Sequence, residues 1–275
     1  KGIYYIIFLI LLYSILYRTV YGSAIRSSGI LKMDVITYGH YGASLMILSF
    51  YQIYKNPNLV SFRSIYIIGL FLGLIVIFVS GSRSPLIAVA ISIIFFYYKK
   101  LNILKSTIFF SISFFLIYIF SYDILLFINS AYPNTLVDRI LHGIRNYDDL
   151  GGRNIFLSIG IEEFMQSPII GNSFLITKTH FKGTYPHNLI IEAFMALGII
   201  GGMIFTALNF NILRYVNKII ISKKYEWIGL LFLQFFIFGM FSGNIFSSTL
   251  YWIFLGLVIT SKQSNSNYYK KGQNI

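Results

Sequence analysis

Long apolar runs constrain this chain more than any other feature, because a helix needs only about 17–25 apolar residues to cross a bilayer. Only 11% of the 275 residues are charged and 56% are hydrophobic, whereas a soluble domain carries roughly 25% charged residues. The sequence therefore predicts an all-α integral membrane protein and excludes a soluble enzyme, a disordered chain and a disulfide scaffold. We expect about eight membrane-spanning helices, at residues 3–17, 35–54, 64–80, 85–98, 106–128, 188–208, 227–242 and 245–260.

The predicted spans divide the chain into four regions. Residues 1–128 hold five spans, residues 129–187 form a long extracytoplasmic loop with short amphipathic helices, residues 188–260 hold three spans, and residues 261–275 form a polar cytoplasmic tail. Loops of such length in compact proteins are usually functional or disordered, and the helical period that starts at Arg153 argues against disorder. Because Lys1 lies inside an apolar pattern, we expect a fragment that lacks earlier membrane helices.

Basic residues outnumber acidic residues by 22 to 9. We interpret this excess as a topology signal, not as a nucleic-acid-binding surface, because lysine-rich short loops fall on one side when the loop 209–226 is taken as cytoplasmic. Arginine, whose planar fork binds phosphate and carboxylate, dominates the other side. The outer face is therefore predicted to bind an anion. The cations expected there are Arg18, Arg26, Lys32, Arg83, Arg139, Arg145, Arg153, Lys178 and Lys182.

Arg83 lies in a predicted outer turn at residues 80–85. Ser84 is a suitable N-cap and Pro85 suits the first helical position, so Arg83 would lie at the positive end of a helix dipole, where phosphate binds readily. The alternative is an arginine that extends its charged end from the membrane edge into water. Arg26 is a further outer arginine beside a flexible turn.

Arg153 follows Gly151-Gly152 at the predicted start of the loop helix. Two glycines let the backbone turn tightly and approach a ligand closely, and Arg153 would then project from a second helix N-terminus. The alternative is a helix-entry turn with a solvated arginine.

His187-Asn188 opens the predicted span at 188–208. Asn188 can cap this helix, and a histidine at a helix N-terminus has its protonated form disfavoured, which leaves a neutral imidazole able to accept a proton. The alternative is a hydrogen-bonded interfacial histidine. Glu192 lies about one turn inside the span, where an ionisable group is costly and is a functional hypothesis by default. Its simpler role is to pair with a neighbouring arginine or to orient His187.

Several chemistries are excluded or unsupported by the residues present. The chain has no cysteine, so disulfides, iron–sulfur clusters and thiol nucleophiles are excluded. Histidines 40, 142 and 180 show no metal-ligand spacing with carboxylates, so no metal site is predicted. No glycine-rich phosphate loop with a lysine and no nucleic-acid-binding pattern occurs, and we expect no cofactor.

The elements described above follow one another in a fixed order over residues 26–202. They are Ser82-Arg83, Gly152-Arg153, Pro168 with Gly171, and His187-Asn188 with Gly198 and Gly201. This arrangement resembles the bacterial O-antigen ligase/polymerase family, which includes O-antigen and capsular polysaccharide polymerases and lipid A-core ligases. Gly198, Gly201 and Gly202 are also expected to let helices pack closely in lipid.

The resemblance implies a metal-independent glycosyltransferase of the bacterial cytoplasmic (inner) membrane, similar to the GT-C-like architecture, with its active site facing the periplasm or exterior. Its donor would be a glycan on undecaprenyl diphosphate and its acceptor a glycan or lipid A-core, with other polysaccharide assembly proteins as further partners. Arg83 and Arg153, together with Arg26, would bind the diphosphate. His187 would activate the acceptor hydroxyl, supported by Glu192 and Asn188.

Two features depart from the family pattern, and three functions stay open. Gly171-Asn172-Ser173 lacks a second glycine often present in the family, and Lys32-Met33-Asp34 replaces an Asn-Pro element, which weakens the assignment of Arg26. We favour a polymerase of O-antigen or capsular repeat units. The alternatives are an O-antigen ligase and, from another class, a transporter of lipid-linked glycan that uses the arginines only for binding.

Overall fold

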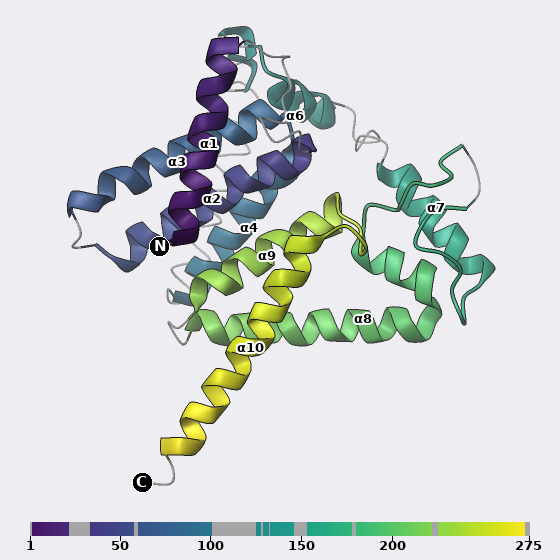
Figure 1. Cartoon of the computed structure of the whole chain (residues 1–275). Helices are drawn as coiled ribbons and strands as arrows, with labels where there is room; N and C mark the ends of the chain where they lie inside the picture. Colours follow the sequence, from purple (N-terminus) through teal and green to yellow (C-terminus); the bar gives the residue numbers. More distant parts are fainter. Residues whose placement is uncertain are drawn as a thin grey trace. The chain divides into compact units, whose positions relative to one another are not determined.

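In the computed structural model of the chain, every regular element among the described residues is an α-helix (Figure 1). The helices are α1 (Gly2–Tyr21), α2 (Val35–Lys55), α3 (Val60–Ser80), α4 (Arg83–Lys100), α6 (Thr135–Arg145), α7 (Arg153–Gln166), α8 (Leu189–Ile221), α9 (Glu226–Phe241) and α10 (Thr249–Gly272). The structure describes residues 2–21, 34–57, 60–100, 125–127, 129–131, 133–145, 153–177, 180–221 and 225–272.

Seven of the eight predicted spans coincide with helices, namely α1 to α4 and α8 to α10. Within the part of the chain that the structure describes, two segments are long and apolar enough to cross a membrane, Arg63–Ser80 and Leu189–Ile221. The apolar parts of α1, α4, α9 and α10 are shorter. Residues 101–124 and 128, which make up most of the predicted span 106–128, lie outside the described residues. The helix α10 continues to Gly272, into the segment predicted as a polar tail.

The chain divides into two compact units, Lys1–Tyr147 and Asp148–Ile275, and each is described here by itself. In the first unit, α2 packs on α1, α3 and α4. A Cβ atom on Gly42 would lie 2.8 Å from the carbonyl oxygen of Gly73, so glycine at this point lets the backbones of α2 and α3 approach closely. The amphipathic helix α6 contacts α3 and α4 and buries Leu136, Val137 and Leu141.

In the second unit, α8 contacts α7, α9 and α10. Gly160 of α7 allows close approach to Pro186 and Ile191, because a Cβ atom there would lie within 3 Å of both side chains. A small apolar core forms between α7, the following loop and α8, from Ile159, Ile176 and Met195. This packing fixes the start of α7 and the residues before α8 relative to each other.

Gly198 interrupts α8 with a backbone conformation of φ 66° and ψ −169°. The sequence predicted an unbroken span with glycines on a helix-packing face, and for Gly198 this was wrong. Its Cβ position is occupied by the backbone of Ile169, which belongs to the loop after α7. Only glycine combines a positive φ with such a close approach at little cost. The helix therefore consists of a short part, residues 189–197, and a long part, residues 199–221 (Figure 1).

Candidate functional site

Four predicted site residues of the second unit contact one short stretch of the chain, residues 240–248. This stretch comprises the last two residues of α9 and the residues that lead to α10, and it is called the α9–α10 junction. Arg153, the first residue of α7, donates from Nη2 to Oγ of Ser242 at 2.9 Å. Ser242 follows the last residue of α9 and is buried. An arginine that begins one helix is thus held by a hydroxyl that ends another.

His187 lies at the same serine. Its Nδ1 is 3.5 Å from the carbonyl oxygen of Ser242. A carbonyl only accepts, so this contact places the proton on Nδ1 and leaves the lone pair on Nε2. The ring also packs against Tyr185 and Phe156, with centroid distances of 4.4 and 5.1 Å.

The environment of His187 favours its neutral form. Burial lowers the pKa of the imidazole and the positive charge of Arg153 lowers it further, while the hydrogen bond to Ser242 acts in the opposite direction. The backbone of His187 has φ 56°, a region that residues other than glycine seldom occupy. Strain of this kind is often retained at functional sites. His187 is therefore half-buried in a constrained backbone position, and its surroundings favour the neutral imidazole.

Asn188 confirms the predicted cap of α8. Its Oδ1 accepts from the backbone amides of Ile190 and Ile191 at 3.0 and 3.1 Å. Its Nδ2 donates to the carbonyl oxygen of Met240 at 3.3 Å, so the same side chain also holds the end of α9.

Glu192 is buried and accepts from the backbone amide of Ile245 at 2.8 Å. The sequence offered an arginine or His187 as its partner, whereas the contact seen is with the α9–α10 junction. Glu192 and His187 therefore contact the same junction at different residues, Ile245 and Ser242.

In the first unit, two arginines join the turn before α4 to α6. Arg83 Nη1 donates to the carbonyl oxygen of Arg139 at 3.2 Å, and Arg139 Nη1 donates to the carbonyl oxygen of Gly81 at 3.0 Å. Each guanidinium therefore bonds the backbone of the other segment. Both side chains are partly exposed.

The turn before α4 is supported from α2. Ser84 is fully buried, and its Oγ lies 3.2 Å from Nε2 of His40. A Cβ atom on Gly39 would come within 3 Å of Ser80 and Pro85, so glycine admits the turn. Ser84 does not cap α4, because the helix already begins at Arg83. The predicted capping role was wrong, since the buried histidine takes the hydroxyl.

The second unit brings together Arg153, His187, Asn188 and Glu192, and the first unit contains Arg83 with Arg139. Arg26 and the glycines before Arg153 lie outside the described residues. Among the residues that the structure describes, no group of three or more acidic or histidine side chains could hold a metal ion.

Sequence reasoning missed the roles of Ser242 and Arg139. Ser242 begins a very short turn between two apolar runs, on the side that span alternation assigns to His187, and this shared side was the available signal. Arg139 was grouped with the outer cations, and its place on an amphipathic helix was the signal for a second arginine at the Arg83 turn. Glu163 was also missed, and its carboxylate accepts from the amide and hydroxyl of Thr177.

The chain was compared with known proteins. A family model described as O-antigen ligase matches residues 68–206, just over half of the chain. The matched region includes Arg83, Arg139, Arg153, His187 and Glu192. Searches of curated proteins and of solved structures gave no significant match.

Proposed function

The chain belongs to the O-antigen ligase family, and we propose that it polymerises undecaprenyl-diphosphate-linked repeat units into O-antigen or capsular polysaccharide. The family is a class of inner-membrane, glycosyltransferase-like ligases and polymerases that act on lipid-linked glycans. We further propose about eight spans in a GT-C-like arrangement, with the site on the periplasmic or exterior side. The outer arginines support this orientation.

The reaction requires a base and a site for negative charge. The acceptor hydroxyl attacks the anomeric carbon of the donor glycan, and the bond from that carbon to the phosphate oxygen breaks. The lipid diphosphate leaves with the bonding electron pair, and the hydroxyl proton passes to the base. General-base assistance typically contributes 10²–10⁴-fold, and fixed positive groups near the leaving oxygen contribute more when the site excludes water.

Two residues of the second unit are suited to these roles. Nε2 of His187 is available to accept the hydroxyl proton, because Nδ1 is directed at the carbonyl of Ser242. Arg153 is close enough to lower the pKa of the imidazole, so a phosphate that it binds would lie near the base. Asn188 and Glu192 hold the backbone on which both depend.

Arg83 is proposed as a further ligand of the diphosphate, with Arg26 in a supporting part. The planar guanidinium of arginine matches two phosphate oxygens at once, and Arg83 begins α4, where the helix dipole adds positive potential. Positive charge from arginine supports a mechanism that needs neither a metal ion nor a cofactor.

The observation that carries the proposal is the convergence of Arg153 and His187 on Ser242. The test is an assay of purified protein in liposomes with a defined lipid-linked repeat unit. His187→Ala should abolish chain extension and retain donor binding. His180→Ala is the matched control, because His180 is an exposed histidine of the same loop, and it should keep normal extension. Normal product length with His187→Ala would refute the base assignment.

The same assay distinguishes the other functions. Offering a second repeat unit or lipid A-core as acceptor separates a polymerase from a ligase, because only the productive acceptor becomes extended. A transporter would move the lipid-linked unit across the bilayer with no new glycosidic bond in either case.

A further inference from the structure

The loop after α7 contains an apolar turn at residues 167–175, which is called the 167–175 turn below. No charged residue occurs between Glu163 and Lys178. Ile169 and Ile170 are 69% and 81% exposed, and Phe174 and Leu175 are also exposed. Contiguous exposed apolar surface of this kind marks an interaction site.

The turn is firmly attached to the break in α8. The backbone amide of Ile199 donates to the carbonyl oxygen of Pro168 at 2.7 Å, and that of Asn172 donates to Met195 at 2.9 Å. A Cβ atom on Gly171, which has φ 82°, would collide with the backbone of Ala196. The two isoleucines are therefore held in place by contacts on both sides of Gly198.

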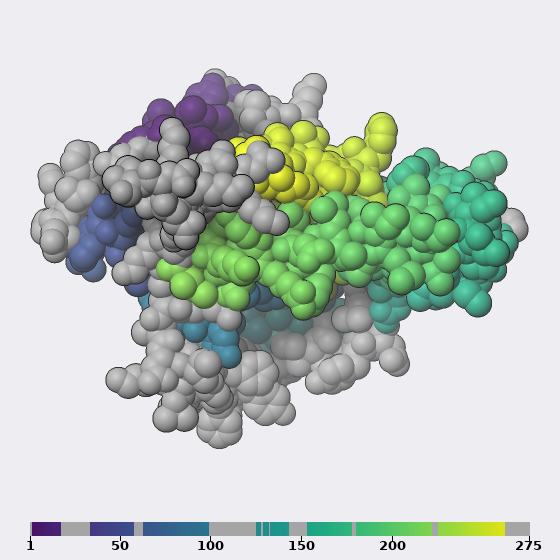
Figure 2. Space-filling view, turned by 90° about the horizontal axis from the view of Figure 1, so that it is seen from below, coloured from purple at the N-terminus to yellow at the C-terminus, as the bar shows by residue number. Residues whose placement is uncertain are grey.

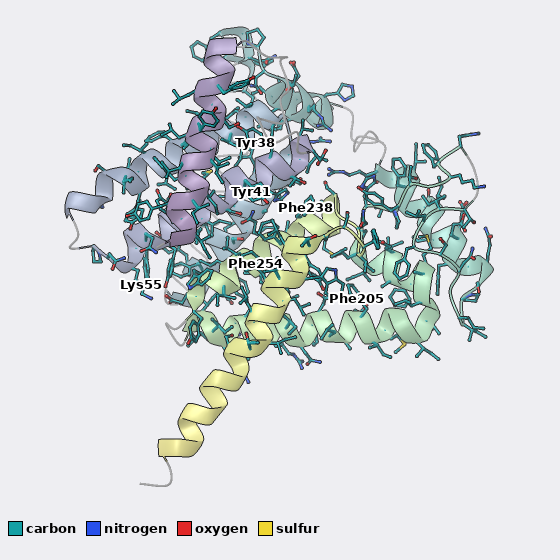
Figure 3. All side chains as sticks on the ribbon, in the orientation of Figure 1. Tyr38, Tyr41, Lys55, Phe205, Phe238 and Phe254 are labelled. Atoms are coloured by element: carbon teal, nitrogen blue, oxygen red, sulfur yellow. The ribbon has the colours of Figure 1, made fainter. Side chains whose placement is uncertain are left out.

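The exposed surface continues onto the long part of α8. Ile200, Met203 and Ile204 are each more than half exposed, and their spacing puts them on one face of the helix. This face belongs to one of the two segments long and apolar enough to cross a membrane. Lipid is therefore the natural covering of that face. Figure 2 shows the green band of α8 adjoining the teal segment that contains α7. Phe205, labelled on α8 in Figure 3, packs against Trp252 near the start of α10.

We propose that the 167–175 turn inserts Ile169 and Ile170 into the outer leaflet and binds the boundary between lipid headgroups and acyl chains. An apolar edge flanked by cationic residues is suited to such a surface. The occupant is the bilayer itself. The insertion would hold the loop, and with it the start of α8, at the level of lipid phosphates.

The test uses the absence of cysteine from this chain. Ile170→Cys carries an environment-sensitive fluorophore in liposomes of phosphatidylethanolamine and phosphatidylglycerol. Ser158→Cys, on the exposed face of α7, is the matched control. The probe at position 170 should emit at shorter wavelength and be quenched by lipids with a spin label near the headgroup. The probe at position 158 should be quenched by aqueous iodide instead.

Two results would overturn the proposal. Iodide quenching at position 170 equal to that at position 158 would mean that the turn lies in water. A blue-shifted emission without quenching by spin-labelled lipid would mean that protein covers the turn, such as a second copy of the chain. Neither readout depends on glycosyl transfer, so failure here leaves the proposed function untouched.

Discussion

Arg153 and Ser242 are 89 residues apart in sequence, yet the guanidinium of one donates to the hydroxyl of the other at 2.9 Å. The contact joins the first residue of α7 to the residue that ends α9. The carbonyl of the same serine faces His187. The side chain of Ser242 therefore contacts Arg153, and its backbone contacts His187. Substitution of the side chain alone therefore separates the two contacts.

Ser242→Ala should reduce turnover and leave the imidazole contact in place. A hydrogen bond to a charged group contributes about 1.5–3 kcal/mol, and loss of the lower figure in the transition state alone slows the reaction about tenfold. Initial rates of chain extension measure the effect. Ser247→Ala, an exposed serine of the same junction, is the control. Equal rates for both variants would show that Arg153 needs no anchor.

Activity should persist below the pH at which an ordinary histidine is protonated. Burial, aided by Arg153, lowers the pKa of His187, so the base form survives below about pH 6.5. The acidic limb of kcat/KM against pH should fall below that value. Arg153→Gln removes one lowering influence and should move the limb to higher pH, towards the ordinary value.

The same shift has a consequence for stability. In the unfolded chain His187 binds a proton near pH 6.5, whereas the folded imidazole resists it, so acidification below that pH favours unfolding. Thermal unfolding in detergent should therefore show that acidification lowers the Tm of His187→Gln less than it lowers the Tm of the native chain. In the activity measurement, an acidic limb of kcat/KM at or above pH 6.5 for the native chain would contradict the proposed environment of His187.

Gly198→Ala should destabilise the second unit. A non-glycine residue in this backbone region costs about 1–3 kcal/mol, and the added Cβ would also collide with the backbone of Ile169. Thermal unfolding followed by circular dichroism should show a lower Tm. Gly256→Ala is the control, because a Cβ atom there meets nothing within 4 Å, and it should be neutral or slightly stabilising. Equal Tm values for the two variants would show that α8 can be continuous.

Arg139→Gln should raise the KM for the lipid-linked donor. Its bond to the carbonyl of Gly81 and the return bond from Arg83 hold the turn before α4. Arg139→Lys keeps a positive charge and one donor and should restore part of the affinity. Asp138→Asn is the control, because Asp138 faces Asn129 and is exposed. A lower Tm with an unchanged KM would mean that Arg139 stabilises the fold and does not contribute to donor binding.

Local sequence signals predicted helix ends well. Asn188 marks the start of α8 as predicted, because a cap acts on neighbouring backbone groups. The arginine at the start of α7 was predicted for the same reason. The break at Gly198 was not predicted, because it depends on contact with a loop about thirty residues earlier. A local apolar pattern does not reveal such a contact.

The site shows the same division. His187 and Arg153 were found from residue type and motif order, but the α9–α10 junction that holds them has no distinctive residue. Ser242 contributes one ordinary hydroxyl and one carbonyl, and its importance comes from tertiary contact alone. Glu192 was correctly singled out as an unusual acidic group, and its partner, a backbone amide, could not be read from any pairing of charges.

The interruption of α8 also gives one helix two axes. The 167–175 turn is bonded to Met195 before Gly198 and to Ile199 after it, so the angle between the two parts is fixed at the break. The short part that follows His187 therefore takes its direction from α7 and the turn, and that direction differs from the axis of the long apolar part that is suited to cross a bilayer.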